Sequence, residues 1–139
     1  MNIDGYKVKL HLFDLAGLEI LYQTSRLLSK GAHCAVVVTD FVEPSYATDS
    51  FKYYKNLLND VGPIPAVLLR NKCDFEIEYP PLVEQFNNFQ KEYNLKSFDV
   101  SAKDNTNIDE AFQYVATEAF HKFLDENKDI NSFLYLSNK

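Results

Sequence analysis

Short apolar runs alternate with stretches of helical periodicity along the 139-residue chain. Continuous apolar runs at residues 33–39 and 66–70 predict two strands buried on both faces of a sheet, and residues 97–101 predict a third, shorter strand. Three amphipathic helices are predicted between and after these runs. Their inward-facing residues are Ala47, Phe51, Tyr54 and Leu58; Leu82, Phe86 and Phe89; and Ile108, Ala111, Phe112, Val115, Ala116, Ala119, Phe120 and Phe123. This alternation predicts an α/β domain with a largely parallel sheet.

Boundary signals flank the three predicted helices. Ser45 is placed to cap the first, and Gly62-Pro63 ends it. Pro80-Pro81 opens the second. Asn107 and Glu110 predict an N-cap with its reciprocal acid at the start of the third.

The first residues predict an incomplete hairpin. Asp4-Gly5 is a strong hairpin-turn signal, and residues 7–12 alternate polar and apolar side chains as a half-exposed strand does. Only three residues precede the turn, so one arm of the hairpin is almost absent. We therefore expect the sequence to begin in the middle of a fold. At the other end the helical pattern decays into a polar tail containing an apolar stretch at residues 133–136.

Composition and charge exclude several classes of protein. A formal charge of −6 argues against a nucleic-acid partner, which requires a basic surface. No apolar run approaches the length of a membrane span, and no basic-then-apolar signal segment opens the chain. Cys34 and Cys73 are expected to be reduced thiols of a cytoplasmic protein. The three histidines show no metal-ligand spacing.

Candidate chemistry lies in three polar turns that follow strands: Asp14-Leu15-Ala16-Gly17, Asn71-Lys72-Cys73-Asp74 and Ser101-Ala102-Lys103. The carboxyl edge of a parallel sheet is where α/β proteins bind their ligands. There the carboxylate of Asp74 can accept both the N1–H and the N2 amine of guanine, a pair of donors that adenine lacks. Asn71 would brace the turn, and the aliphatic stem of Lys72 can lie over a flat base.

The order and spacing of these turns resemble the Ras superfamily of small GTPases, and the Rab proteins most. The stretch Phe13-Asp14-Leu15-Ala16-Gly17-Leu18-Glu19 is similar to the Rab stretch Trp-Asp-Thr-Ala-Gly-Gln-Glu. Lys30-Gly31-Ala32-His33, followed by a valine-rich strand ending at Asp40, is also Rab-like. The likeness runs from about Ile3 to about Phe120. It implies a three-layer α/β sandwich of the P-loop NTPase (Ras-like) type over residues 1–124, followed by a tail at 125–139.

The resemblance assigns two residues to the phosphate end of a bound nucleotide. Asp14 would hold Mg²⁺ through a water molecule. Gly17 would donate its backbone N–H to the γ-phosphate of GTP and report the presence of that phosphate to the following switch segment. No residue of the chain is assigned a catalytic role.

The remaining assignments concern the base. Asn71, Lys72 and Asp74 would read guanine, and Ser101 would support Asp74. In the same turn, Ala102 would donate its backbone N–H to the guanine O6, and Lys103 would cover the edge of the base.

Two departures from the family bear on nucleotide binding. The chain has only four glycines and no Gly-x-x-x-x-Gly-Lys-Ser/Thr loop to cradle phosphates. The resemblance thus implies an N-terminally truncated domain whose central strand is missing, between the strands matching residues 6–13 and 34–39. GTP, GDP and Mg²⁺ are expected to bind weakly or not at all, because charged phosphate contacts supply most of the family's affinity.

Further departures concern hydrolysis and membrane attachment. Leu18 stands where the family has a water-orienting glutamine, so slow GTP hydrolysis is expected. No cysteine follows Cys73, so no prenyl anchor is expected in this chain. Any contact with endomembranes would then go through partner proteins.

Two functions remain open at this point. The first is a Rab-like GTPase switch in vesicle traffic, impaired as this chain, with effector and regulator proteins as partners. The alternative is a pseudo-GTPase interaction module without nucleotide turnover. A generic α/β domain of the receiver type is less favoured because it does not explain the guanine-reading turns.

Overall fold

The computed structural model describes residues 1–15, 27, 29–40, 44–75 and 79–127, with no side-chain description for residues 44–46. Its main sheet is parallel, in the order β3 (Ala35–Asp40), β4 (Ala66–Asn71) and β5 (Lys96–Asp99). The register pairs Asp40 with Asn71 and Arg70 with Asp99. The strands therefore end close together, and their last residues, Asp40, Asn71 and Asp99, lie at one edge of the sheet.

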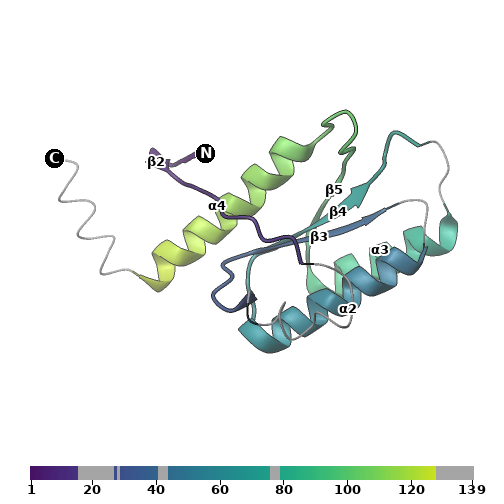
Figure 1. The fold of residues 1–139 in the computed structure, drawn as a ribbon, viewed down its shortest axis with the longest axis horizontal. Coiled ribbons are helices and arrows are strands. Elements are labelled where there is room, and N and C mark those ends of the chain that lie inside the picture. The colour runs from purple at the N-terminus through teal and green to yellow at the C-terminus, as the bar shows by residue number, and fades with distance from the viewer. Residues whose placement is uncertain (16–26, 28, 41–43, 76–78, 128–139) are drawn as a thin grey trace.

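Helices cover both faces of this sheet, as Figure 1 shows. One face carries α2 (Pro44–Val61) and α3 (Pro80–Tyr93), and the other carries α4 (Ile108–Glu126). Leu68 of β4 points into the first core cluster, and Val67 and Leu69 point into the second. Two cores on opposite faces of one sheet make the predicted three-layer α/β sandwich, which is confirmed.

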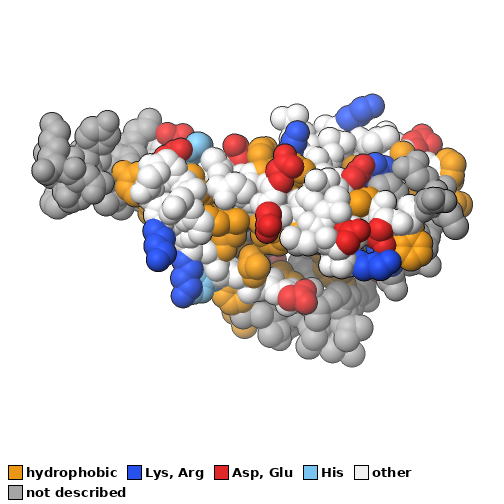
Figure 2. All heavy atoms as spheres, turned by 90° about the horizontal axis from the view of Figure 1, so that it is seen from above, with side chains coloured by type: hydrophobic (Ala, Val, Ile, Leu, Met, Phe, Trp, Pro, Cys, Tyr) orange, Lys and Arg blue, Asp and Glu red, His pale blue; other side chains and the backbone are white. Residues whose placement is uncertain are grey.

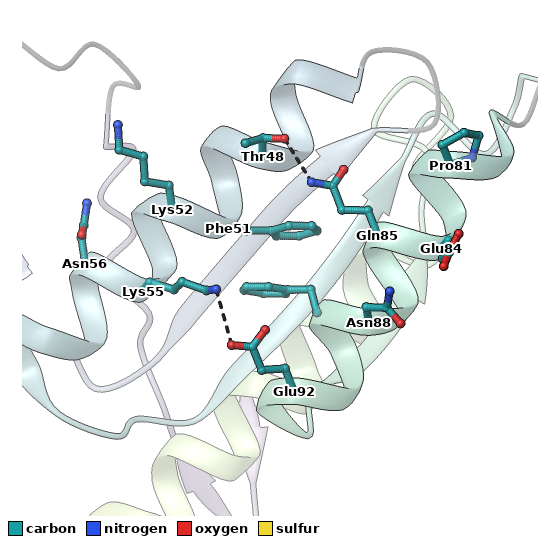
Figure 3. Close-up of a pocket in the computed structure, with 11 residues that line it drawn as sticks. Thr48, Phe51, Lys52, Lys55, Asn56, Pro81, Glu84, Gln85, Asn88 and Glu92 are labelled. Atoms are coloured by element: carbon teal, nitrogen blue, oxygen red, sulfur yellow. Dashed lines mark hydrogen bonds and ion pairs between the residues drawn. The ribbon is translucent and has the colours of Figure 1, made fainter.

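The groove between α2 and α3, of about 630 Å³, has an aromatic floor. The ring of Phe51 stacks on that of Phe89 with centroids 3.9 Å apart. A polar pair flanks the stacked rings on each side, as Figure 3 shows: Gln85 donates to Thr48 at 3.0 Å, and Lys55 pairs with Glu92 at 3.4 Å. These contacts fix α2 and α3 side by side.

Burial of the first apolar run on both faces was predicted, and this is wrong for β3. Val37 is buried, but Val38 is 47% exposed. The second core cluster gathers over β4 and reaches β3 at Val36, without Val38. Within the described residues β3 also has a strand neighbour on one side only. Continuous apolar sequence therefore did not guarantee burial, because the described part of the chain leaves Val38 partly uncovered.

The predicted Asp4-Gly5 turn is confirmed. Both residues have positive φ, 50° and 84°, and they join β1 (Asn2–Ile3) to β2 (Tyr6–Lys7). The predicted strand over residues 7–12 is wrong beyond Lys7. Val8 still exchanges backbone hydrogen bonds with Met1 at 2.9 Å, but no described strand lies beside residues 9–15 to pair with them. The hairpin instead rests on α4, where the Tyr6 and Phe120 rings lie 5.4 Å apart.

Helix boundaries agree with the sequence except at two caps. Ser45 was predicted to cap the first helix, but α2 already begins at Pro44, so Ser45 lies inside the helix. The helix α2 ends at Val61, where Gly62 with φ 79° donates its N–H to the Leu58 carbonyl, and α3 begins at Pro80 as predicted. The capping prediction for Asn107 is wrong. Its backbone is left-handed, and its side-chain amide donates to the Asp99 carbonyl at 2.8 Å instead of capping α4.

The surface is mixed in charge. On the face seen in Figure 2, acidic side chains stand beside basic ones. None of the helices in the described ranges is long and apolar enough to cross a bilayer. Cys34 and Cys73 are both free thiols, as predicted.

Candidate guanine-binding site

The loops after β4 and β5 form one unit at the carboxyl edge of the sheet. The Val100 N–H donates to the Arg70 carbonyl at 2.9 Å, and the Cys73 N–H donates to the Val100 carbonyl at 3.0 Å. A short bridge between Ser101 and Thr106 closes the second loop. Two predicted turns that are 30 residues apart in the sequence are thereby held in register.

Asp74 lies between groups of the second loop. The Ser101 hydroxyl donates to its Oδ1 at 2.8 Å, and the Lys103 ammonium approaches its Oδ2 at 3.4 Å. The hydrogen bond from Ser101 is the largest cause that lowers the pKa of the Asp74 carboxyl, with Lys103 adding to it. Asp74 is therefore an anion at neutral pH. A carboxylate has about four lone-pair positions, so these two contacts leave acceptor capacity for further N–H donors.

Cys73 lies near carboxylates of both loops. The pKa of the Cys73 thiol is raised by burial first and then by three nearby carboxylates: Asp104, Asp74 and Asp99. The thiol is held in its neutral form, so it adds no charge beside Asp74. A ligand edge that presents N–H donors suits such a site better than one that presents acceptors.

Asn71 joins the two loops directly. Its Oδ1 accepts the Ala102 N–H at 3.0 Å. This contact braces the turns, but it also uses the N–H that was predicted for the guanine O6. If Ala102 donates to a guanine O6 as predicted, that oxygen would have to share the N–H with the Asn71 oxygen or replace it.

Lys72 is held toward β3. Its backbone has φ 66°, a left-handed conformation that lysine rarely adopts, and its Nζ pairs with Asp40 Oδ2 at 2.7 Å. The Asp40 side chain is only 8% exposed. Asp40 was not among the predicted site residues. The available signal was its position as a polar residue ending an apolar strand, at the same edge as Asn71.

Asp14 lies elsewhere. It lines a hollow of about 300 Å³ with the edge of β3 and the side of α2, including Val36, Ser50 and Tyr53. Within the described ranges, no three His, Cys, Asp or Glu side chains gather as metal ligands. Mg²⁺ is usually bound through one or two carboxylates together with water molecules and substrate phosphates, so a carboxylate such as Asp14 is compatible with the predicted role, which stays a prediction. Gly17 and Leu18, and the tail after Asn127, lie outside the described residues.

Replacing Ser101 by alanine tests the electrostatics of Asp74. Without the donated hydrogen bond, the pKa of Asp74 is expected to rise toward its ordinary value. A lowered pKa in the folded state contributes stability that is present above the unfolded-state pKa and lost as pH falls through the folded-state pKa. In Ser101→Ala this stabilising contribution should be smaller, and its acid-side loss should be complete at a higher pH.

Carboxyl-carbon NMR titration measures this shift. Ser50→Ala is the matched control, because its hydroxyl donates to the Val38 carbonyl, away from Asp74. An Asp74 pKa equal in Ser101→Ala and the parent protein would contradict the assigned cause.

Comparison with known proteins identifies the family of the chain. A sequence model of the Ras family matches residues 1–121. The chain is 35% identical to human "Ras-related protein Rab-32", over 89% of this chain and 59% of that protein. It is 31% identical to Rab-2B of Dictyostelium discoideum, over 95% of this chain and 65% of that protein.

The golden hamster (Mesocricetus auratus) Rab-13 is 28% identical to the chain, over 88% of this chain and 61% of that protein. The chain thus spans about three fifths of the length of the curated relatives it matches. With the three-layer fold and the paired turns, the family match over residues 1–121 shows that this chain belongs to the Ras family of small GTPases, with Rab-like sequence.

Proposed function

We propose that the chain binds the base of a guanine nucleotide as part of a Rab-like GTPase switch. The observation that carries this proposal is the Asp74 carboxylate, which Ser101 orients from one side at 2.8 Å. A carboxylate fixed in this way accepts two adjacent N–H donors, and guanine offers such a pair at N1 and N2. Adenine presents an acceptor at N1, so it would meet the carboxylate with repulsion.

Other residues at this edge of the sheet would support a bound base without distinguishing guanine from adenine. Asn71 holds the two loops together, and the aliphatic stem of Lys72 offers a surface for a flat ring. Lys103 is 80% exposed and flanks Asp74, in a position to cover the edge of a bound base. Ala102 would contribute its N–H to the guanine O6 once Asn71 shares it.

Binding of the phosphates is proposed to be weak in this chain. None of the 139 residues forms a Gly-x-x-x-x-Gly-Lys-Ser/Thr loop. Charge-assisted bonds to phosphate are among the strong contacts of a nucleotide site, and their loss lowers affinity for GDP and GTP alike. Discrimination between bases is a separate property, because it depends on Asp74 and not on the phosphates.

The wider biological role follows from the family. Ras-family proteins act through effector and regulator proteins, and we propose such partners for this chain. Work at endomembranes, reached through those partners, is proposed from the likeness to Rab proteins.

A second function, a pseudo-GTPase interaction module, is favoured by a specific observation. Leu18 replaces the glutamine that orients the attacking water in the family, and leucine can neither donate to water nor accept from it. This replacement favours a scaffold that binds proteins without turning over nucleotide.

Calorimetric titration with GDP tests the proposal, with ADP as the control ligand. The folded chain, verified by circular dichroism, is expected to bind GDP with a micromolar or weaker dissociation constant and to give no heat with ADP. No heat with either nucleotide from the folded chain would favour the interaction module. A submicromolar dissociation constant for GDP would contradict the expected weak binding.

A further inference from the structure

Two lysines lie beside the base-reading carboxylate, and the structure gives them different partners. Lys103 approaches Asp74 at 3.4 Å, whereas Lys72 pairs with Asp40 at 2.7 Å. We propose that Asp40 is a positioning residue for base recognition: it holds the Lys72 ammonium at the end of β3 and so keeps the Asp74 carboxylate open to the ligand. This inference rests on the proposed function.

The Asp40–Lys72 pair has the geometry of a strong contact. Its N–O separation of 2.7 Å is typical of a charge-assisted hydrogen bond, and the Asp40 side chain is 8% exposed. Screening by solvent and salt is weak for such a buried carboxylate. The sheet fixes its position, since Asp40 is the register partner of Asn71, the residue before Lys72.

The contact of Lys103 with Asp74 is of a different kind. At 3.4 Å the separation is long, and the Lys103 side chain is 80% exposed. Exposed pairs of this type are weak, and a ligand can displace them easily. Lys103 therefore leaves the acceptor positions of Asp74 available. A cation that was less exposed and made a shorter contact would occupy them.

Releasing Lys72 would create such a competitor. Lys72 and Asp74 are two residues apart in one tight turn, and a lysine side chain has four flexible carbons. Without the Asp40 carboxylate, the ammonium has an acidic partner within reach at Asp74. A charge-assisted bond there would occupy lone pairs that guanine N1–H and N2 need. Asp40 would thus act on the ligand through Lys72.

A double-mutant cycle tests this inference, using the whole chain in four forms: parent, Asp40→Asn, Lys72→Met, and the double variant. Methionine keeps an aliphatic stem of similar length but has no charge. Asp40→Asn is expected to lower the pKa of Asp74, seen by carboxyl-carbon NMR. It should also reduce the preference for GDP over ADP about tenfold, the lower end of what a hydrogen bond to a charged group contributes. In the Lys72→Met background, the same substitution is expected to change neither quantity.

The alternative role has a different signature. If Asp40 only supports the fold, Asp40→Asn will have the same effect in both backgrounds, and the inference is overturned. Asp40→Glu retains a carboxylate and should keep the parent pKa of Asp74; this variant decides the question if Asp40→Asn folds poorly. Asp125→Asn near the end of α4 is the control for loss of one charge.

The two readouts separate this inference from the proposed function. The pKa of Asp74 is measured without nucleotide, so the cycle gives a result even for a chain that binds no GDP. Absence of GDP binding with a background-dependent pKa shift would refute base recognition and retain the Asp40–Lys72 control of Asp74. An Asp74 pKa that is the same in the parent and Asp40→Asn would refute the inference whether or not GDP binds.

Discussion

Asp74→Asn is expected to abolish the preference of this chain for GDP over ADP. The substitution removes the negative charge and puts an amide donor where guanine presents two donors. Hydrogen bonds to charged groups contribute about 1.5–3 kcal/mol each, so loss of this recognition should weaken guanine binding roughly a hundredfold. Competition between GDP, ADP and XDP measures the change. Xanthine has a carbonyl at C2, which an amide N–H can meet, so XDP should gain relative to GDP.

Asp104→Asn is the matched control, because Asp104 lies in the adjacent loop. Its carboxylate accepts hydrogen bonds from the Thr106 hydroxyl at 2.6 Å and from the Thr106 N–H at 3.2 Å. The Asp104→Asn substitution removes the same charge from the same edge of the sheet, but Asp104 has no proposed role in base reading. An unchanged GDP preference in Asp74→Asn would contradict the assignment of Asp74. Protein partners that bind Asp74→Asn normally would show that base reading and partner binding are separable.

Phe89→Ala is expected to cause the largest loss of stability. Phe89 is 3% exposed, stacks on Phe51 at 3.9 Å, and contacts the rings of Tyr54 and Tyr93. Removing it leaves a cavity between α2 and α3, and such substitutions cost about 3–5 kcal/mol. This is a large share of the total of about 5–15 kcal/mol that is typical of folded domains. Urea unfolding should show the midpoint shifted far to lower concentration.

Phe75→Ala provides the comparison for side-chain type. Phe75 follows Asp74 in the turn and is 52% exposed, so its removal opens no closed cavity. Its cost should remain below about 1 kcal/mol, in the range of substitutions away from the core. Equal effects of the two phenylalanine substitutions would contradict the view that the aromatic floor of the groove holds α2 and α3 to the sheet.

The sequence determined the elements whose signals are local. Apolar periodicity and Pro80 predicted α3, and the run at residues 66–70 predicted β4, because a helix or buried strand must place its apolar side chains on particular faces. The Asp4-Gly5 turn was predictable because few residue pairs accept two positive φ angles in succession. The polar side chains of the two turns proposed to read guanine were likewise visible in the residue types.

Tertiary structure decided what depended on neighbours. Residues 9–12 continue the alternation of a strand, but a strand needs a partner for its backbone hydrogen bonds, and local pattern cannot supply one. The exposure of Val38 depends on where α4 lies. Asn107 is a residue type that often caps helices, yet its side-chain amide donates a hydrogen bond to the nearby Asp99 carbonyl.

The candidate site shows the same division. The order of residues determined that Asp74 and Ser101 would follow strands, and the parallel register then brought them within 2.8 Å. The pairing of Lys72 with Asp40 and of Ala102 with Asn71 could not be read from the sequence. Each of these groups has several possible partners of similar chemistry in the sequence. The distances in the packed sheet determine which partner it contacts.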